Sequence, residues 1–294
     1  MTSSPPLLRA LDAPRCELGE GATYDPRTDT AWWFDILGRT LLEHRFADGT
    51  TIVHGLPFMA SALARIDQGR QLLATEKGLY VREIATGRLT LHREIEAADD
   101  ATRSNDARTH PSGAFWMGTM GKHAEEGRGA IYWYRAGEVR RLFGDITITN
   151  CICFSPSGDR GYFTDTKKGQ ILTLALDPAT GLPQGEPVAF GSTDLPGHPD
   201  GAVTDAEGRL LVARWGGACV SILDTEGRHV RDIALPTGQI TCPAFVGTAA
   251  ASLLVTSAAT GYDDEARRAD PTAGATFVGE IGVTGRFDPE VRIG

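Results

Sequence analysis

Four polar residues occupy corresponding places in this sequence, each five positions before a turn. They are two carboxylates, Glu20 and Asp200, and two carboxamides, Asn105 and Asn150. Their oxygens are hard ligands, which suit a divalent cation with flexible coordination, such as Ca²⁺, Mg²⁺ or Mn²⁺, better than a closed zinc site. Two ionised carboxylates balance the charge of such an ion. A cation held in this way polarises an ester carbonyl and lowers the pKa of bound water.

The turns that define these positions belong to a repeated unit. Each unit has a short apolar strand, a turn that usually ends in Gly, and a second strand rich in Leu, Val, Phe or Trp. The turns start at Asp25, Asp67, His110, Ser155 and Asp205, and a degenerate sixth lies near Val246. They are about 40 to 50 residues apart, which is the blade period of a β-propeller.

Six such units fill the chain without a linker between them. We therefore predict a single all-β domain over residues 1–294, a six-bladed β-propeller with four-stranded antiparallel blades. Residues 1–19 precede the first unit, and we expect them to supply a strand that closes the last blade.

The innermost strands of a propeller line its central channel, so equivalent positions converge at one end of that channel. Asp200 is then a neighbour of Glu20 and Asn150 in a ring, in which Ala62 and, loosely, Thr241 occupy two further places. Asp and Asn are also common at turns and strand entries, so one of them alone would carry no meaning. Four oxygen donors among six equivalent positions favour a shared metal site.

The second strand of each unit runs back toward the same end of the channel. Its last residues are expected to form an outer wall around the ring: Asp35, Glu76, Met120, Asp165 and Trp215. Trp215 is a candidate for stacking on a sugar ring, with ordinary packing as the alternative. The longer connections at residues 121–128 and 261–274 are expected to be rim loops, where substrate contacts usually lie.

The net charge of −9 argues against a nucleic acid or an anionic membrane as partner. No segment approaches the roughly 18 apolar residues of a membrane-spanning helix. The first residues also lack the charged and apolar regions of a signal peptide. We therefore expect a cytoplasmic protein that acts on a small molecule, as a monomer or a small homo-oligomer.

Other catalytic schemes find little support in the sequence. The five cysteines match no disulfide or zinc pattern, and Cys151 and Cys153 would pack on one face of a strand. The histidines form no HExxH pair, and no GxSxG nucleophile motif is present. His123 and His198 lie near the expected active end, and we interpret both as surface residues.

Four stretches place these residues in a wider pattern: LGEGATYD around Glu20, RSNDARTHPSGAFWMGTM from Arg103, ITNCICFSPSG around Asn150 and HPDGAVTDAEG around Asp200. In their order and spacing they resemble the SMP-30/gluconolactonase/regucalcin-like sugar lactonases. The resemblance extends from about Cys16 to the last residue. The stretches TNCICFSPSG and ARWGG are especially similar to bacterial pentono- and hexonolactonases.

The resemblance implies a six-bladed propeller with one catalytic divalent metal ion. Its ligands would be Glu20, Asn150 and Asp200, while Arg103 and Asn105 would bind the substrate. Members of this family hydrolyse lactones of aldonic acids with calcium, zinc, manganese or iron(II).

The sequence departs from the family pattern at three places without losing a ligand. Cys151 stands where many relatives have Gly after the Asn ligand, Ala107 replaces a Gly, and Ala275 replaces the second Gly of a late motif at residues 271–277. Because Gly permits unusual backbone angles, the change at Cys151 affects the expected substrate preference more than the expected activity.

We therefore expect metal-assisted hydrolysis of a sugar lactone to its aldonic acid, as a step in sugar oxidation. Asp200 would also orient or deprotonate the attacking water, although a carboxylate bound to a cation is a weak base. One alternative is a phosphotriesterase-type hydrolase on the same metal site, which an apolar pocket would favour. Another is a non-catalytic propeller in which the metal only ties blades together or binds a partner.

Overall fold

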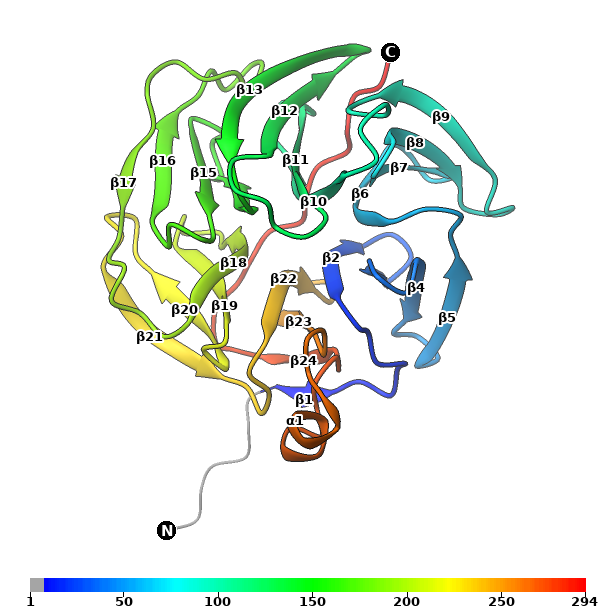
Figure 1. Cartoon of the computed structure of the whole chain (residues 1–294), viewed down its shortest axis with the longest axis vertical. Helices are drawn as coiled ribbons and strands as arrows, with labels where there is room; N and C mark the ends of the chain where they lie inside the picture. The colour runs from blue at the N-terminus through cyan, green and yellow to red at the C-terminus, as the bar shows by residue number, and fades with distance from the viewer. Residues whose placement is uncertain (1–7) are drawn as a thin grey trace.

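The chain folds as a six-bladed β-propeller, as the sequence predicts. The computed structural model describes residues 8–294. Six four-stranded antiparallel sheets surround a central axis (Figure 1). In five of these sheets the four strands follow one another in chain order.

The first three blades are built from consecutive strands. Blade 1 contains β2 (Gly19–Asp25), β3 (Thr30–Asp35), β4 (Thr40–Arg45) and β5 (Thr50–Gly55). Blade 2 contains β6 (Ala60–Arg65), β7 (Arg70–Thr75), β8 (Gly78–Glu83) and β9 (Leu89–Glu94). Blade 3 contains β10 (Thr102–Thr109), β11 (Phe115–Gly121), β12 (Gly129–Arg135) and β13 (Glu138–Ile146).

Two further blades follow the same plan, and the sixth combines the two ends of the chain. Blade 4 contains β14 (Thr149–Phe154), β15 (Arg160–Asp165), β16 (Ile171–Ala175) and β17 (Val188–Phe190). Blade 5 contains β18 (His198–Thr204), β19 (Leu210–Trp215), β20 (Cys219–Leu223) and β21 (His229–Ala234). Blade 6 contains β22 (Ile240–Val246), β23 (Ser252–Ser257), β24 (Phe277–Glu280) and β1 (Arg9–Ala10).

Pairing of β1 with β24 makes the N-terminal segment the outermost strand of blade 6. Arg9 lies opposite Val278 and Ala10 opposite Phe277. The circle of blades is thus closed by hydrogen bonds between strands from opposite ends of the chain. Residues 1–7 of the segment expected to close this blade lie outside the described residues.

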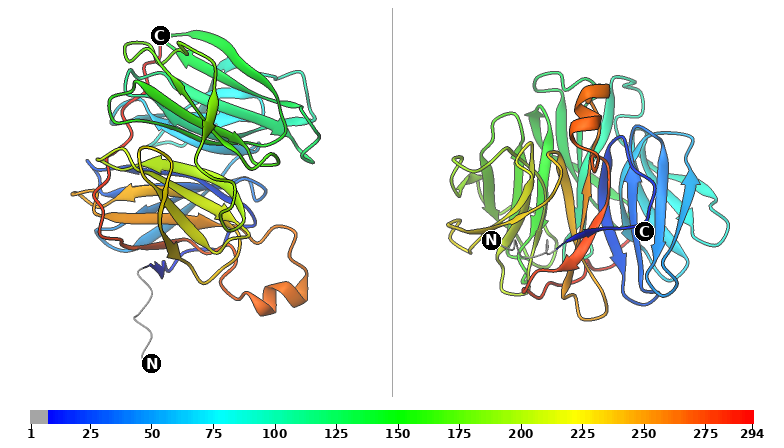
Figure 2. Two further views of the ribbon diagram at one scale, coloured as in Figure 1. Left: turned by 90° about the vertical axis from the view of Figure 1, so that its left-hand side faces the viewer. Right: turned by 90° about the horizontal axis from the view of Figure 1, so that it is seen from below.

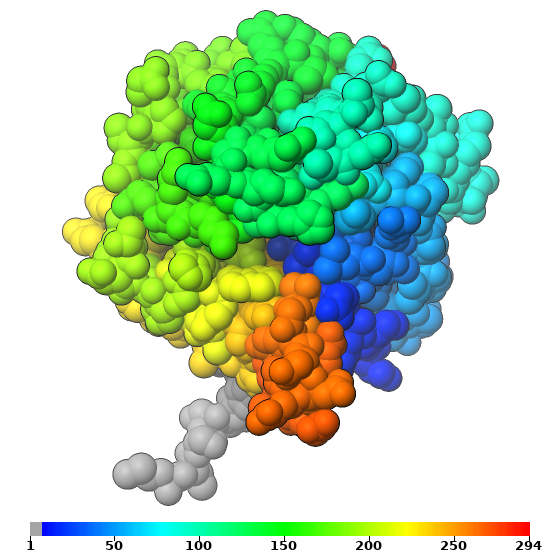
Figure 3. Space-filling view, viewed as in Figure 1, coloured from blue at the N-terminus to red at the C-terminus, as the bar shows by residue number. Residues whose placement is uncertain are grey.

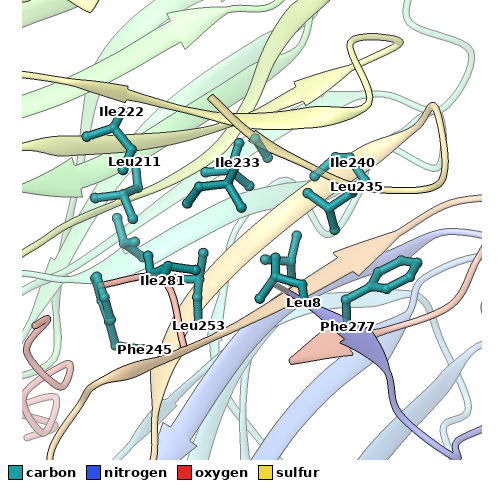
Figure 4. Packing of buried hydrophobic residues seen from close by; sticks show 14 of the residues in the cluster. Leu8, Leu211, Ile222, Ile233, Leu235, Ile240, Phe245, Leu253, Phe277 and Ile281 are labelled. Atoms are coloured by element: carbon teal, nitrogen blue, oxygen red, sulfur yellow. The ribbon is translucent and has the colours of Figure 1, made fainter. Parts of the chain in front are cut away.

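Burial along the strands explains their sequences. Every residue of β2, β10, β14 and β22 is buried, because an inner strand packs between neighbouring blades. The outermost strands β5 and β9 are largely exposed or half-buried. The hydrophobic core lies between adjacent blades; between blades 5 and 6, for example, Leu211 and Ile222 share a cluster with Leu253 and Phe277 (Figure 4).

The two faces of the propeller carry different segments (Figure 2). A short helix, α1 (Asp264–Ala269), projects from the face turned toward the viewer in Figure 1, and none of its residues is buried. The C-terminal segment, residues 282–294, runs across the opposite face. Within residues 8–294, no helix has the length and apolar character needed to cross a membrane.

The C-terminal segment contacts all six blades. The Gly285 N–H donates to the carbonyl oxygen of Ala250, and the carbonyl oxygen of Thr284 accepts from the Ala206 N–H. The Arg286 side chain donates to the carbonyl oxygen of Phe154, and the Phe287 ring contacts Tyr24. Asp288 accepts from Arg65 at its carbonyl oxygen and from Arg108 at its carboxylate. A segment that touches every blade opposes the separation of any one blade from the others. The stability of the propeller therefore depends in part on this segment.

The ion pair of Asp288 with Arg108 offers a test of that dependence. Arg108 is buried, and its Nη1 lies 2.7 Å from Oδ2 of Asp288. Asp288→Ala leaves the guanidinium without this partner, so we expect the free energy of unfolding to fall by about 1–3 kcal/mol in urea titrations. The matched control is Glu290→Ala, because the Arg27–Glu290 pair is partly exposed on both sides. It should cost less than about 1 kcal/mol. Equal, small losses in the two variants would contradict this role of the segment.

Candidate metal centre

A pocket of about 530 Å³ opens at the end of the channel on the face that carries α1. Figure 3 views this face, with the segment that carries α1 in orange. All five residues that the sequence singles out as ligands or substrate contacts line this one pocket: Glu20, Arg103, Asn105, Asn150 and Asp200. They come from the inner strands of four different blades. The structure therefore brings together residues up to 180 positions apart in the chain.

An irregularity of strand pairing lies beside each oxygen donor. The register between the first and second strands shifts just after Glu20, across Asn105, just after Asn150 and across Asp200. Such a bulge leaves residues unpaired, bends the strand and re-aims its side chains. The inner strands thus give up regular pairing at the places where polar side chains turn toward the channel.

The remaining two inner strands carry the same irregularity without an oxygen ligand at the pocket. Register shifts occur between Ala60 and Ala62 in β6 and between Ile240 and Pro243 in β22. Neither Ala62 nor Thr241 lines the pocket. The bulge is therefore a property of all six blades, and the residue type at each bulge decides which blades contribute to the site.

The residues that follow Glu20 and Asn150 adopt left-handed backbone angles. Gly21 has φ of 63° and Cys151 has φ of 56°. A Cβ on Gly21 would lie 2.0 Å from the carbonyl oxygen of Ser61, so only glycine fits there. Cys151 tolerates the same conformation, at a cost of about 1–2 kcal/mol, and its Sγ donates to the carbonyl oxygen of Asp200 at 2.9 Å. The backbone at Cys151 therefore keeps the left-handed conformation that a glycine would permit.

A chain of hydrogen bonds fixes the two carboxamides. Arg103 donates from Nη1 to Oδ1 of Asn105 at 2.8 Å. Asn105 donates from Nδ2 to the carbonyl oxygen of Thr149 at 2.8 Å and to Oδ1 of Asn150 at 3.0 Å. With its nitrogen engaged in this way, Asn105 cannot reverse its amide without losing these bonds. The network holds the oxygens of both carboxamides in defined positions.

Thr166 completes the network and was not singled out from the sequence. Its Oγ1 accepts from Nδ2 of Asn150 at 2.8 Å and donates to the carbonyl oxygen of Pro199 at 2.8 Å. One hydroxyl thus joins Asn150 in blade 4 to the residue that precedes Asp200 in blade 5. Outer partners of this kind orient metal ligands and are often as important to affinity as the ligands themselves.

The two carboxylates share an environment that disfavours their charged forms. Glu20 and Asp200 are 6% and 4% exposed. Burial, followed by the nearby charge of Asp106, raises the pKa of Glu20 to about 8. Burial, followed by the charge of Glu20, raises the pKa of Asp200 well above its usual value. Burial likewise lowers the pKa of Arg103 to about 10, although both carboxylates favour its charged form.

This environment fits a divalent cation. Two buried carboxylates and one guanidinium leave a net negative charge, and an ion of charge +2 compensates both carboxylates where burial makes their charges costly. No other side chain within residues 8–294 donates a hydrogen bond to the Asp200 carboxylate, so its oxygens are available to a ligand. Among the same residues, the Glu20 carboxylate accepts only the backbone N–H of Gly21, at 3.1 Å.

The donor set also limits the kind of metal site. Across the described part of the chain, no three His, Cys, Asp or Glu side chains gather in a way that could hold an ion. The ring instead offers two carboxylates and neighbouring amide oxygen, with space for water in the pocket. Such a set suits a hard cation that retains water ligands better than a closed thiolate or imidazole site.

Three of the five expected wall residues have a different role. Glu76 does not line the pocket; it accepts the backbone N–H of Met59 and pairs with Lys122. Asp35 and Asp165 do not line the pocket but accept backbone N–H groups at 2.9 to 3.1 Å from the segments that lead into β2 and β14. They hold the entries of the strands that carry Glu20 and Asn150. Met120 and Trp215 do line the pocket, as expected.

The rim contains residues that the sequence argument missed. Lys122, from the expected rim loop at residues 121–128, and Lys167 both line the pocket. His198 also lines it, whereas His123 does not. Lys122 and Lys167 come just after the ends of second strands. Their positions in the sequence, like those of Met120 and Trp215, therefore place them near the ring.

Replacement of Thr166 tests the hydrogen-bond network. Thr166→Val keeps the shape of the side chain but removes the hydroxyl that fixes the Asn150 amide. We expect the affinity for a divalent cation to fall about tenfold to a hundredfold in calorimetric titrations. Thr166→Ser retains the hydroxyl and should recover most of the affinity. Wild-type affinity in the Val variant would show that the hydroxyl does not support the ligand.

The raised pKa of Glu20 predicts a characteristic pH dependence of the metal-free protein. Its usual value is 4.5 and its value in the folded protein is about 8, so the folded state binds the proton more tightly than the unfolded state. Stability must then fall as the pH rises from about 4.5 to about 8. We expect the Tm of the metal-free protein to drop across this window, and a divalent cation to reverse the drop at pH 8. A Glu20→Gln variant should show a smaller drop, and an equal drop would contradict the assignment.

Comparison with known proteins places this chain in a family. Residues 18–259 match the SMP-30/Gluconolactonase/LRE-like region. A putative sugar lactone lactonase of Rhizobium meliloti is 49% identical over 97% of both chains. An L-arabinolactonase of Azospirillum brasilense is 35% identical over 90% of this chain and 89% of that one. A crystal structure of regucalcin from Agrobacterium tumefaciens, described as a calcium-binding protein, is 51% identical, with a TM-score of 0.95 and 97% of both chains covered. The chain therefore belongs to the SMP-30/gluconolactonase/LRE-like family.

Proposed function

We propose that this protein hydrolyses a sugar lactone to its aldonic acid with one divalent cation held by Glu20, Asn150 and Asp200. The observation that carries the proposal is the pair of buried carboxylates at the floor of an open pocket, with one guanidinium to compensate them. Relatives named sugar lactone lactonase and L-arabinolactonase support the reaction class. We further propose a role in sugar oxidation, which produces such lactones.

Hydrolysis of a lactone needs three things from the site. Water must add to the carbonyl carbon, the negative charge that develops on the carbonyl oxygen must be stabilised, and the ring oxygen must take up a proton as its bond to carbon breaks. A divalent cation supplies charge stabilisation for an ester carbonyl and lowers the pKa of bound water. The side chains of the protein have to hold the ion, orient the water and position the sugar.

Asp200 is proposed to act as a ligand and as the group that orients the attacking water. Its carboxylate receives no hydrogen bond from another side chain within residues 8–294, so an oxygen remains free to accept one from water. Binding of a cation lowers the pKa of a carboxylate and weakens it as a base. Orientation of the water is therefore its principal proposed contribution, and deprotonation is the lesser one.

Arg103 and Asn105 are proposed to hold the polar groups of the sugar. Both hydrogen bonds from Nη1 of Arg103 go to the protein, to the carbonyl oxygen of Ser104 and to Asn105, which leaves Nε and Nη2 for a substrate. Both hydrogens of the Asn105 amide are used as well, so it can meet a substrate hydroxyl only as an acceptor through Oδ1. This polar floor favours a sugar lactone, whereas walls that include Leu18, Met120 and Ile148 suit an apolar group, so both substrate classes enter the test below.

Calcium is the first cation to test, followed by Mn²⁺, Fe²⁺ and Zn²⁺. Oxygen ligands and room for water favour Ca²⁺. A similar protein of known structure is described as calcium-binding, which supports the same choice.

Proton release from a panel of lactones tests the proposal. Xylono-, arabinono-, galactono- and gluconolactone would each be offered to metal-stripped protein and to protein given one of the four cations. The acid product ionises, so each hydrolysed lactone releases a proton. We expect hydrolysis above the spontaneous rate only when a cation is present, because the cation stabilises the charge that develops on the carbonyl oxygen. If no pair of cation and lactone is accelerated while phosphotriesters are, the site serves the alternative hydrolase. If hydrolysis of neither lactones nor phosphotriesters is accelerated, and the cation only raises the Tm, the propeller is non-catalytic.

Removal of one carboxylate tests the assignment of the site. Asp200→Asn keeps the size of the side chain but removes its charge, so we expect kcat to fall by at least about a hundredfold. Circular dichroism and thermal unfolding should show that the fold is kept. The control is Asp194→Asn, an exposed carboxylate in the segment before β18, which should retain wild-type activity. An Asp200→Asn variant with near-normal kcat would refute the assignment.

A further inference from the structure

The charges that line the pocket are not balanced. Its acidic residues are Glu20 and Asp200, which lie at the floor, and its basic residues include Arg103, Lys122 and Lys167. The protein as a whole has a net charge of −9. The positive excess is therefore a local feature of the pocket and not a reflection of overall composition.

Two of the three cations are already accounted for. Lys122 is paired with Glu76, with 2.5 Å between Nζ and Oε2, and Glu76 also accepts the backbone N–H of Met59. Arg103 is held at the floor by its bond to Asn105. When Glu20 and Asp200 compensate a divalent cation, Arg103 adds one positive charge that no carboxylate at the floor balances.

Lys167 differs from the other lysine of the pocket. Its side chain forms no ion pair with any carboxylate in residues 8–294. Its neighbour Lys168 lies 3.9 Å from Asp165, has a side chain that is 70% exposed and does not line the pocket. Lys167 is exposed and lines the pocket, so it supplies an uncompensated ammonium group near the opening of a pocket whose floor has excess positive charge once a divalent cation is bound.

The size of the pocket leaves room for more than a simple sugar lactone. Its volume of about 530 Å³ lies within the range of roughly 300–1,000 Å³ that is typical of pockets for drug-sized ligands. A substrate whose lactone group reaches the ring can therefore extend further substituents toward the mouth. Lys167 is exposed and lines the pocket, so it lies near this opening.

We propose that the preferred substrate is a sugar lactone with an acidic group, a carboxylate, phosphate or sulfonate, remote from the lactone carbonyl, and that Lys167 binds this group. The inference rests on the proposed lactonase function and specifies its substrate class. An ammonium group attracts any of the three anions as a point charge. Lys167 is thereby a specificity-determining residue, separate from the groups that act on the lactone carbonyl.

Matched pairs of lactones test this substrate class. Glucarolactone and phosphogluconolactone would be compared with gluconolactone, their neutral parent, using the metal-loaded protein. We expect kcat/KM for the acidic lactones to exceed that for the neutral one by at least about fivefold, with the difference mainly in KM. Raising the ionic strength from about 0.01 M to about 0.2 M should reduce this preference, because salt screens a charge at the mouth of the pocket. The carboxylate and phosphate arms show which acidic group fits.

Variants of Lys167 locate the origin of the preference. Lys167→Gln should lower the ratio of kcat/KM for acidic over neutral lactones at least about fivefold, and Lys167→Arg should restore it. Lys168→Gln is the matched control and should leave the ratio at its wild-type value. An equal kcat/KM for acidic and neutral lactones in the wild type, or the same ratio in Lys167→Gln as in the wild type, would overturn the proposal.

A binding measurement separates this proposal from the lactonase function itself. Calorimetric titration of the glucarate dianion and the gluconate anion needs no turnover. Tighter binding of glucarate to the wild type, lost in Lys167→Gln and kept in Lys168→Gln, supports the anion site. Equal binding of the two anions overturns it. Failure to hydrolyse any lactone, acidic or neutral, would refute the proposed function, and the titration would still decide whether Lys167 forms an anion site.

Discussion

The site depends on the burial of two carboxylates, Glu20 and Asp200, at one end of the channel. Their charges cannot be solvated there as they would be in water, and the nearby guanidinium of Arg103 balances only one of them. We propose that a divalent cation resolves this imbalance and that the surrounding groups serve as its ring of oxygen donors. Bulges, left-handed backbone at Gly21 and Cys151, and the amide network accompany the oxygen donors that line this pocket.

The propeller separates the stability of the chain from the chemistry of the site. Apolar clusters between adjacent blades hold the blades together. The C-terminal segment, which touches every blade, adds to this on the face opposite the pocket. The opposite end of the channel is left to polar side chains and rim loops. A rigid scaffold is needed because the three proposed ligands, from blades 1, 4 and 5, must meet within bonding distance of one ion. Substitutions at the opening of the pocket, such as those of Lys167, are then expected to alter substrate preference without disturbing the core.

Much of the fold and part of the site could be predicted from the sequence. Turns at regular spacing gave the six blades, and counting back from them located Glu20, Asn105, Asn150 and Asp200, which line one pocket. Thr166 could not be found in this way, since its role depends on a hydroxyl that bridges two blades. Asp35 and Asp165 were expected beside the ring from the direction of their strands. Strand direction alone does not show that their carboxylates instead accept backbone N–H groups.

Calorimetric titration of the metal-stripped protein with Ca²⁺ at pH 7, in buffers of different ionisation enthalpy, tests the central claim most directly. It measures the number of ions bound and the protons that binding releases. We expect one ion per chain and a release of protons, because burial raises the pKa of Glu20 to about 8 and shifts the pKa of Asp200 in the same direction, and both must be ionised to bind the ion. The release should shrink in Glu20→Gln. Absence of binding, or binding without proton release, would contradict the assignment of the buried carboxylates as metal ligands.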